Sequence, residues 1–183
     1  MKRMWVLLAL SAVAVGLGCS AVDTDTAVAV YGFTLEETVA VRLGLSRIER
    51  TLDVREFVGT YVDFGVIQGT TGAITDYDLY VSAQASVTFG GWERLIGNEG
   101  LELRLDEGGF SGIAPLWVNR EALGFRRAVA PPERTILFVG GNNVRGNTRF
   151  SVAARVNLLS LSEEALRSGS VVTYTVTFTV VER

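Results

Sequence analysis

The final stretch of the chain, residues 170–182, restricts the fold more than any other part of the sequence. Apolar residues alternate there with threonines: Val172, Tyr174, Val176, Phe178 and Val180 against Thr173, Thr175, Thr177 and Thr179. Successive side chains of an extended strand point to opposite faces, so the alternation predicts a strand with one buried and one solvent-facing side. β-branched and aromatic residues also suit a pleated surface. Partner strands are therefore expected elsewhere in the chain.

Two other long segments alternate in the same way. The inward residues expected in 78–89 are Leu79, Val81, Ala83, Ala85, Val87 and Phe89, and this segment stops at Gly90 and Gly91, just before Trp92. Those expected in 150–158 are Phe150, Val152, Ala154, Val156 and Leu158. Shorter apolar runs at 27–33, 39–45, 62–66, 101–105, 113–118 and 135–139 bring the total to about nine strands.

Glycine, asparagine and serine mark the breaks between these segments. Turns are expected at 69–72 (GTTG), 106–109 and 140–143, because glycine and asparagine accept positive φ. Residues 22–26 form a polar leader, and 162–168 is the only helix-like piece, with Ser162 as its cap and Gly169 as its end. The sequence therefore predicts an antiparallel β-sandwich, immunoglobulin-like or jelly-roll-like, with one short helical turn near 162–168.

The first 21 residues are typical of a secretory signal peptide. Lys2 and Arg3 form a positive start, an apolar segment follows over 4–15, and small residues come after it. Two cleavage sites stay open. In a lipoprotein signal Cys19 becomes the lipidated N-terminus, whereas an ordinary signal is cut after Ala21. We expect export to the cell surface, to the outer membrane through a lipid on Cys19, or to the medium, with 22–183 as one domain.

Composition excludes several kinds of chemistry. The chain has no His, and Lys2 is its only lysine, so an imidazole general base and a lysine Schiff base are excluded for the exported part. Cys19 is the one cysteine, which leaves no internal disulfide and no cysteine metal site. Loss of residues 1–20 removes Lys2 and Arg3 and leaves 15 basic against 20 acidic residues, a net charge of -5. This mildly acidic body gives no electrostatic basis for binding nucleic acid or anionic lipid.

Four acidic pairs invite comparison with metal or hydrolytic sites. They are Asp23 with Asp25, Asp76 with Asp78, Glu36 with Glu37, and Glu163 with Glu164. The aspartate pairs have the spacing of calcium ligands but lack the glycine and glutamate of an EF-hand loop. The glutamate pairs resemble the carboxylates of a glycoside hydrolase, but nothing in the sequence places them in a cleft. We therefore expect solvated turn acids, with no catalytic residue, no metal and no cofactor.

The tryptophans Trp92 and Trp117 are the candidate ligand-binding residues. A tryptophan ring can stack on a sugar, and Trp92 follows a double glycine at a strand end, where an aromatic side chain is often exposed. A place in the core or at its rim is the competing interpretation for both. The glycines and asparagines of 140–143 resemble a phosphate-binding loop only superficially, since no helix pattern or lysine follows them.

Residues 78–92 and 150–181 together carry a family resemblance. An exported chain with a long alternating strand that stops at a tryptophan, and with a last strand SGSVVTYTVTFTVVE, resembles secreted bacterial all-β surface proteins, including the WxL-type proteins. The resemblance implies an immunoglobulin-like or pilin-like sandwich. The Trp-x-Leu motif is absent, because Glu93-Arg94 follows Trp92 and Val118-Asn119 follows Trp117. Peptidoglycan binding through that motif is therefore not expected.

Three functions follow from these observations. The first is a non-enzymatic, exported surface or envelope protein, structural or adhesive, whose partners are envelope components or copies of itself. The second is a carbohydrate-binding module that uses Trp92 or Trp117. The third is an enzyme, which the missing histidine and lysine disfavour. A membrane contact is expected only through the candidate lipid anchor on Cys19, and no nucleic acid partner is expected.

Overall fold

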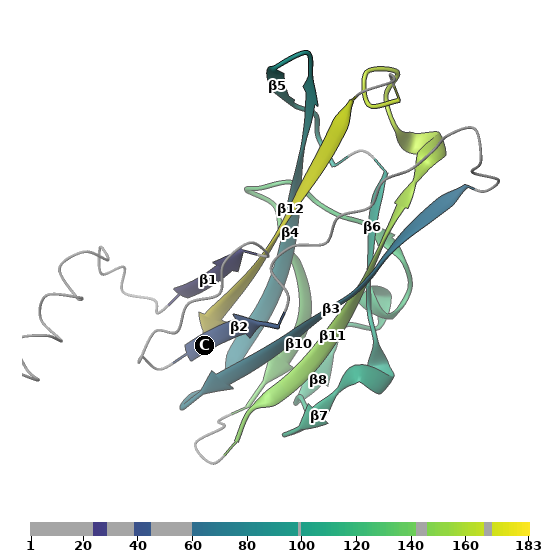
Figure 1. Ribbon diagram of the computed structural model, residues 1–183. Coiled ribbons are helices and arrows are strands. Elements are labelled where there is room, and N and C mark those ends of the chain that lie inside the picture. Colours follow the sequence, from purple (N-terminus) through teal and green to yellow (C-terminus); the bar gives the residue numbers. More distant parts are fainter. Residues whose placement is uncertain (1–23, 29–38, 45–59, 99, 142–145, 167–169) are drawn as a thin grey trace, which may run out of the picture.

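Alternating strands form two antiparallel sheets that pack face to face, as the sequence predicts (Figure 1). The computed structural model describes residues 24–28, 39–44, 60–98, 100–141, 146–166 and 170–183. Within these residues it has twelve strands, compared with the expected number of about nine. Three of them, β7 (Ser111–Gly112), β8 (Trp117–Val118) and β9 (Arg126–Arg127), are only two residues long. The expected signal segment 1–21 lies outside the described residues.

Sheet A has the order β1-β12-β4-β10-β8, with β5 paired to β4. Its longer strands are β1 (Thr24–Val28), β4 (Tyr77–Phe89), β5 (Trp92–Leu95), β10 (Thr135–Gly140) and β12 (Val171–Glu182). The terminal strand β12 is thus central, as it pairs with β4 along its whole length and with β1 over Thr177–Val181. Since β1 already begins at Thr24, the expected polar leader at 22–26 was wrong for Thr24 to Thr26.

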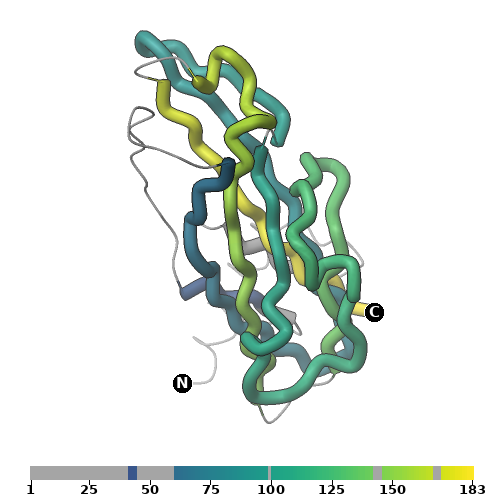
Figure 2. The backbone as a smooth tube through the Cα atoms, turned by 90° about the vertical axis from the view of Figure 1, so that its right-hand side faces the viewer, coloured from purple at the N-terminus to yellow at the C-terminus, as the bar shows by residue number. Residues whose placement is uncertain are grey.

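Sheet B has the order β2-β3-β11-β6-β9, with β7 paired to β11. Its longer strands are β2 (Val39–Leu43), β3 (Tyr61–Ala73), β6 (Leu101–Leu105) and β11 (Thr148–Asn157). Figure 2 views the molecule from the side of sheet B, with β3, β11 and β6 running next to one another. Three short 3-10 helices, η1 (Glu107–Gly109), η2 (Arg120–Leu123) and η3 (Leu158–Ser160), lie in the connections.

The inward rows of the sequence form the core. In β12, Val176, Phe178 and Val180 are buried, Val172 and Tyr174 are half-buried, and the intervening threonines are half-buried or exposed, so the predicted faces are confirmed. The ring of Phe138 in β10 contacts two other aromatic rings. Its centroid lies 5.6 Å from that of Phe150 in β11 and 5.3 Å from that of Phe110. The Phe150 ring in turn lies 5.6 Å from Phe178. These contacts join sheet A to sheet B.

The GTTG segment is not a turn, contrary to expectation. Residues 69–72 lie inside β3, where Gly69 pairs with Phe150. A Cβ atom on Gly69 would approach the Phe150 ring to 2.2 Å, so the glycine makes room for this core ring. Thr71 is fully buried, and its hydroxyl is 2.6 Å from the Tyr77 hydroxyl. Here glycine and threonine serve close packing, which the sequence pattern did not distinguish from a turn.

The face assignment of β3 also changes along the strand. The alternation of residues 61–66 predicts that Val62, Phe64 and Val66 share one face, but Val66 is 41% exposed. Gly65 has a positive φ of 96°, and the pairing with β11 shifts register beside it. A bulge of this kind adds a residue to one strand and exchanges the faces beyond it. The prediction for Val66 was therefore wrong.

The helix-like piece is a single hydrogen-bonded turn in its described part. The Leu166 N–H donates to the Ser162 carbonyl oxygen at 3.2 Å, and the Ala165 N–H donates to the Ser162 hydroxyl at 3.4 Å. Ser162 thus caps this turn as predicted. Residues 167–169 lie outside the described part of the chain.

Candidate functional site

The acidic pairs do not form a ligand set in the described part of the chain. Asp23, Glu36 and Glu37 lie outside it, and Asp25 belongs to the edge strand β1. No cluster of three His, Cys, Asp or Glu side chains that is suited to a metal ion occurs among the described residues. Nor does any helix among them have the length and apolar character needed to cross a membrane.

Asp78 is bound by its neighbours. Its Oδ1 atom accepts a hydrogen bond from Arg183 Nε at 2.6 Å, and its Oδ2 atom accepts one from the Tyr80 hydroxyl at 3.1 Å. The pKa of Tyr80 is raised above 10.0, chiefly because burial disfavours the phenolate and also because of the neighbouring Asp78 carboxylate. Asp78 thus holds Arg183 and Tyr80 in place, which is a structural role.

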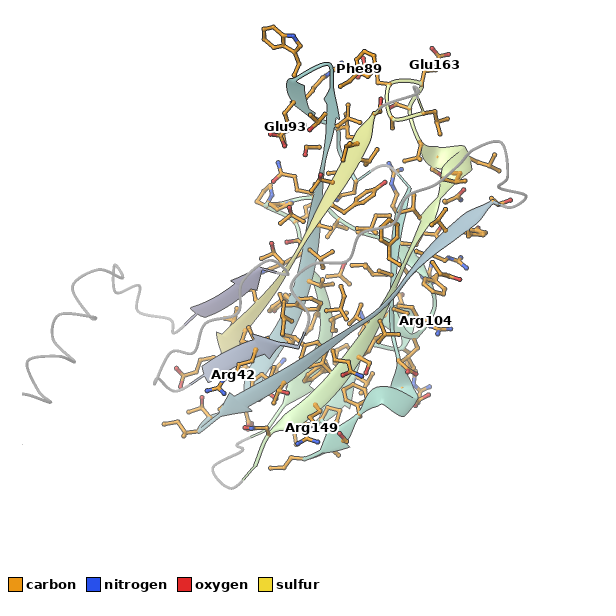
Figure 3. The ribbon with its side chains drawn as sticks, in the orientation of Figure 1. Arg42, Phe89, Glu93, Arg104, Arg149 and Glu163 are labelled. Atoms are coloured by element: carbon orange, nitrogen blue, oxygen red, sulfur yellow. The ribbon has the colours of Figure 1, made fainter. Side chains whose placement is uncertain are left out.

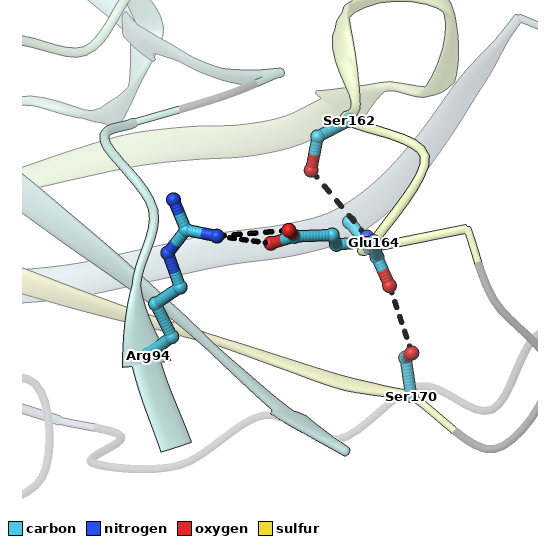
Figure 4. Close-up of polar contacts among 5 residues, drawn as sticks. Arg94, Ser162, Glu164 and Ser170 are labelled. Atoms are coloured by element: carbon cyan, nitrogen blue, oxygen red, sulfur yellow. Dashed lines mark hydrogen bonds and ion pairs between the residues drawn. The ribbon is translucent and has the colours of Figure 1, made fainter. Parts of the chain in front are cut away.

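Glu164 is likewise paired. Arg94 Nη1 of β5 contacts Glu164 Oε1 at 2.8 Å and Oε2 at 3.0 Å, as Figure 4 shows. The Ser170 hydroxyl donates to the Glu164 carbonyl oxygen at 2.9 Å. Glu163, by contrast, is exposed (Figure 3). One carboxylate is held by a guanidinium while the other faces solvent, so this pair lacks the two facing acids that glycoside hydrolysis needs.

A tight hairpin at one end of sheet A presents an aromatic pair. Gly90 and Gly91 have φ values of 57° and 84°, which only glycine adopts readily and which suit a two-residue type I′ turn. The turn places Phe89 of β4 directly opposite Trp92 of β5. Trp92 is 83% exposed and Phe89 is 44% exposed. The expectation that Phe89 faces the core was therefore wrong.

The reason for this exposure is the length of β4. Closer to the middle of the strand, the inward residues Ala85 and Val87 pack with Ile96 and with Ala165 of the 162–166 turn. This small cluster is separate from the main core, and Phe89 belongs to neither cluster. The strand thus runs past the buried part of the sandwich, and alternation alone gives no sign of where the opposite layer ends.

Other large apolar side chains gather at the same end of the molecule. Leu159 of η3 is 82% exposed and Leu166 is 48% exposed, and both belong to the connection between β11 and β12. Val171 pairs with Thr88 beside the hairpin, and Leu95 of β5 is also exposed. In Figure 1 the β5 hairpin and this connection form the upper end. We call this set the apolar tip: Phe89, Trp92, Leu95, Leu159, Leu166 and Val171.

A polar depression lies beside the apolar tip. Its volume is ≈ 490 Å³, and it is lined by Arg94, Leu95, Ile96, Gly97, Ser162, Glu163 and Glu164. The ion pair between Arg94 and Glu164 bridges the hairpin to the 162–166 turn across it. Both side chains are substantially exposed, so the pair positions the two loops without adding much stability.

The structure does not bring the two tryptophans together. Trp117 lies in β8 and is 49% exposed, next to the exposed Leu116. It pairs with Val139, which pairs with Asp78 at the beginning of β4, whereas Trp92 pairs with Phe89 at the end of β4. At about 3.3 Å per residue, the two rings are separated by roughly 35 Å of strand. Of the two candidates, only Trp92 is part of a larger exposed apolar surface.

Sequence reasoning identified Trp92 but not the leucines. Leu159 and Leu166 lie in the segment LLSLSEEALRS, residues 158–168, where the leucines have no regular spacing that would show which of them are exposed. Comparison of this chain with protein-family models, with curated proteins and with solved structures finds no match.

Proposed function

We propose that this chain is an exported, non-enzymatic protein of the bacterial cell envelope that adheres to its partner through the apolar tip. The observation that carries the proposal is that six large apolar side chains at one end of the sandwich are exposed, on strands β4, β5 and β12 and on the connection between β11 and β12. Soluble monomers seldom leave such a patch open, and large ones usually mark an interaction surface. Tryptophan is also the residue type most often found at binding hot spots.

The direction of the chain supports this arrangement. Thr24, the first described residue, pairs with Val181 at the end of β12 that lies away from the apolar tip. Both expected mature N-termini, Cys19 and Val22, are within five residues of Thr24. A lipid on Cys19 would thus hold the protein by one end and leave the apolar tip free to meet a partner. Mass spectrometry of the exported protein distinguishes lipidated Cys19 from free Val22, and an intact Met1 would contradict export.

The proposed absence of catalysis rests on composition. The exported part has no histidine and no lysine, so the two most adaptable bases are missing from it. The described acids near the apolar tip are Glu93, Glu163 and Glu164, and two of them are engaged: Glu164 by Arg94, and Glu93 by a hydrogen bond from the Ser86 hydroxyl at 2.7 Å. This arrangement favours binding over chemistry.

A carbohydrate-binding module is the second candidate. One specific observation favours it: the highly exposed Trp92 stands beside a depression that contains an arginine, a serine and two glutamates. Sugars commonly stack on an aromatic ring while their hydroxyl groups bond to such polar groups. In this case soluble neutral glycans would compete with the envelope for the protein.

We expect Trp92→Ser to weaken binding to isolated cell envelopes by at least about tenfold, since loss of a central tryptophan typically costs 2 kcal/mol or more. Co-sedimentation with envelopes of the producing bacterium measures this. Trp117→Ser is the matched control, because it removes the other tryptophan of the exported part at a distant place. Equal binding by both variants and the wild type would refute adhesion through the apolar tip.

A further inference from the structure

The two sheets of this acidic protein differ sharply in charge. The strands of sheet B contain six arginines and two acids: Arg42, Arg104, Arg126, Arg127, Arg149 and Arg155 against Asp63 and Glu102. The strands of sheet A contain one arginine and four acids: Arg94 against Asp25, Asp78, Glu93 and Glu182. Although the net charge of the chain is negative, the strands of sheet B therefore have a net positive charge. Such segregation focuses a positive potential on one side of the molecule.

Strand register places two of these arginines on either side of Thr70, on the outer face of sheet B. Arg42 of β2 and Arg149 of β11 both pair with Thr70 of β3, so all three share one face. The neighbours Val41 and Phe150 are buried, which identifies the face of Arg42 and Arg149 as the outer one. Both arginines are exposed, and neither forms an ion pair with a described residue. Figure 3 shows both toward the end of the sandwich away from Phe89.

Further along the same face, aromatic rings hold two more arginines. The Arg155 guanidinium lies 3.8 Å from the Tyr61 ring centre and 3.9 Å from the Phe125 ring centre, and Arg104 stacks on Phe125 at 4.8 Å. Stacking of this kind fixes a flat guanidinium and leaves its edge available for hydrogen bonds.

Few acids compensate this charge. Arg155 Nη2 pairs with Glu102 Oε2 at 2.7 Å, so Glu102 is already engaged. Arg104 and Arg127 are exposed and form no ion pair with a described residue. Among the described residues, the remaining acids nearby are Asp63, opposite Arg155 in the register, and Asp106 and Glu107 at the end of β6. The exposed arginines therefore outnumber the free acids on the strands of this face.

We propose that the outer face of sheet B binds an anionic polysaccharide. Guanidinium groups match carboxylate, phosphate and sulfate groups with paired hydrogen bonds. Arg149 and Arg155 lie on the same face of β11 and six residues apart, so roughly 20 Å of strand separates the two arginines, a spacing that suits a linear polymer. Exposed Gln68 and Ser111 lie beside this row and offer partners for sugar hydroxyls. This face is separate from the apolar tip, and the inference goes beyond the function proposed above.

A linear polymer fits this face better than an anionic bilayer does. Proteins that bind membranes usually combine basic residues with apolar side chains that enter the interface. On the strands of sheet B, the only exposed large hydrophobic residues are Tyr61 and Val66 among those described, whereas most others are at the apolar tip. A charged face with few exposed apolar side chains lacks the groups that would enter the membrane interface.

The test compares two double variants with the same loss of charge. Arg42→Ala/Arg149→Ala removes the proposed contacts, and Arg120→Ala/Arg134→Ala removes two exposed arginines outside sheet B. Binding of the exported protein to polygalacturonate and to dextran sulfate is measured at several salt concentrations, with neutral dextran as the blank. We expect wild-type binding that weakens with salt, a loss of at least about tenfold in the first variant, and a change below about twofold in the second.

Several outcomes would overturn the proposal. Equal losses in the two double variants would show general charge attraction without a site. Binding to phosphatidylglycerol vesicles but not to either polymer would assign the face to a membrane. If the protein bound neutral dextran as tightly as the anionic polymers, the arginines would not contribute to polymer binding. Trp92→Ser should leave polymer binding unchanged, so failure here is distinguishable from failure of the apolar tip.

Discussion

Replacement of Phe178 by alanine should lower the free energy of unfolding by roughly 3–5 kcal/mol, a large part of the stability of a domain of this size. Phe178 is fully buried in the central strand of sheet A, and its ring lies 5.6 Å from the Phe150 ring of sheet B. The ring also lies in the main cluster of buried residues, so its removal would leave a cavity in the core. Urea or guanidinium unfolding of the purified protein, prepared without residues 1–21, measures the change.

Thr177→Ala is the control for this prediction. Thr177 is the next residue of the same strand, and it points to the opposite, half-buried face. Its replacement should cost well under about 1 kcal/mol. A shift of the register by one residue would exchange the two faces, so equal losses in the two variants would contradict the assigned faces. Loss of assembly with unchanged monomer stability in Phe178→Ala would instead show that β12 completes the sheet of a second copy.

Gly69→Ala should destabilise the protein by about 1–3 kcal/mol, the usual cost of forcing an extra carbon into a filled core. A Cβ atom at this position would lie 2.2 Å from one atom of the Phe150 ring and 2.5 Å from another. The ring is itself buried against Phe138 and Phe178, so it has no free space to move into. Thermal or chemical unfolding measures this loss.

The matched substitution is Gly97→Ala. Nothing lies within 4 Å of a Cβ atom at Gly97, and its φ is not in the left-handed region. An alanine there restricts the unfolded chain without a clash, so stability should stay within a few tenths of a kcal/mol or rise slightly. If Gly69→Ala changed the stability as little as Gly97→Ala does, residues 69–72 would form a turn and not part of β3.

The sequence was most informative where a strand is long and half-buried. The rows of β12, β4 and β11 follow directly from period-two alternation, because one face of each meets the core. Their pairing was not predictable in the same way. The two sheets and the central place of β12 depend on contacts between residues far apart in the sequence.

The failed predictions concern glycine and the extent of the core. Gly65 and Gly69 look alike in the sequence, yet one provides a bulge with positive φ and the other gives room to an aromatic ring. Phe89 continues a perfect alternation and is still exposed, because β4 is longer than the core it faces. Both outcomes depend on which residues of the opposite sheet face the strand, and the alternation within one segment gives no information about those residues.

The two surfaces proposed for binding were visible only in part. Trp92 stood out as an aromatic after a double glycine, but its apolar neighbours come from a segment some seventy residues later in the chain. The basic face was hidden by the net charge, since its arginines are spread over several strands that only the register aligns. Both surfaces form only when the strands pair and bring residues from distant segments together.

The fluorescence of Trp92 tests the central claim, adhesion through the apolar tip, most directly. Trp5 lies in the expected signal segment, so a protein prepared without residues 1–21 contains Trp92 and Trp117, and its Trp117→Phe variant reports on Trp92 alone. Trp92 is 83% exposed, so its emission should shift to shorter wavelength when envelope fragments cover it. The Trp92→Phe variant, which reports on Trp117, should show no shift. A shift for Trp117 but not for Trp92, or bound protein with no shift for Trp92, would contradict the claim.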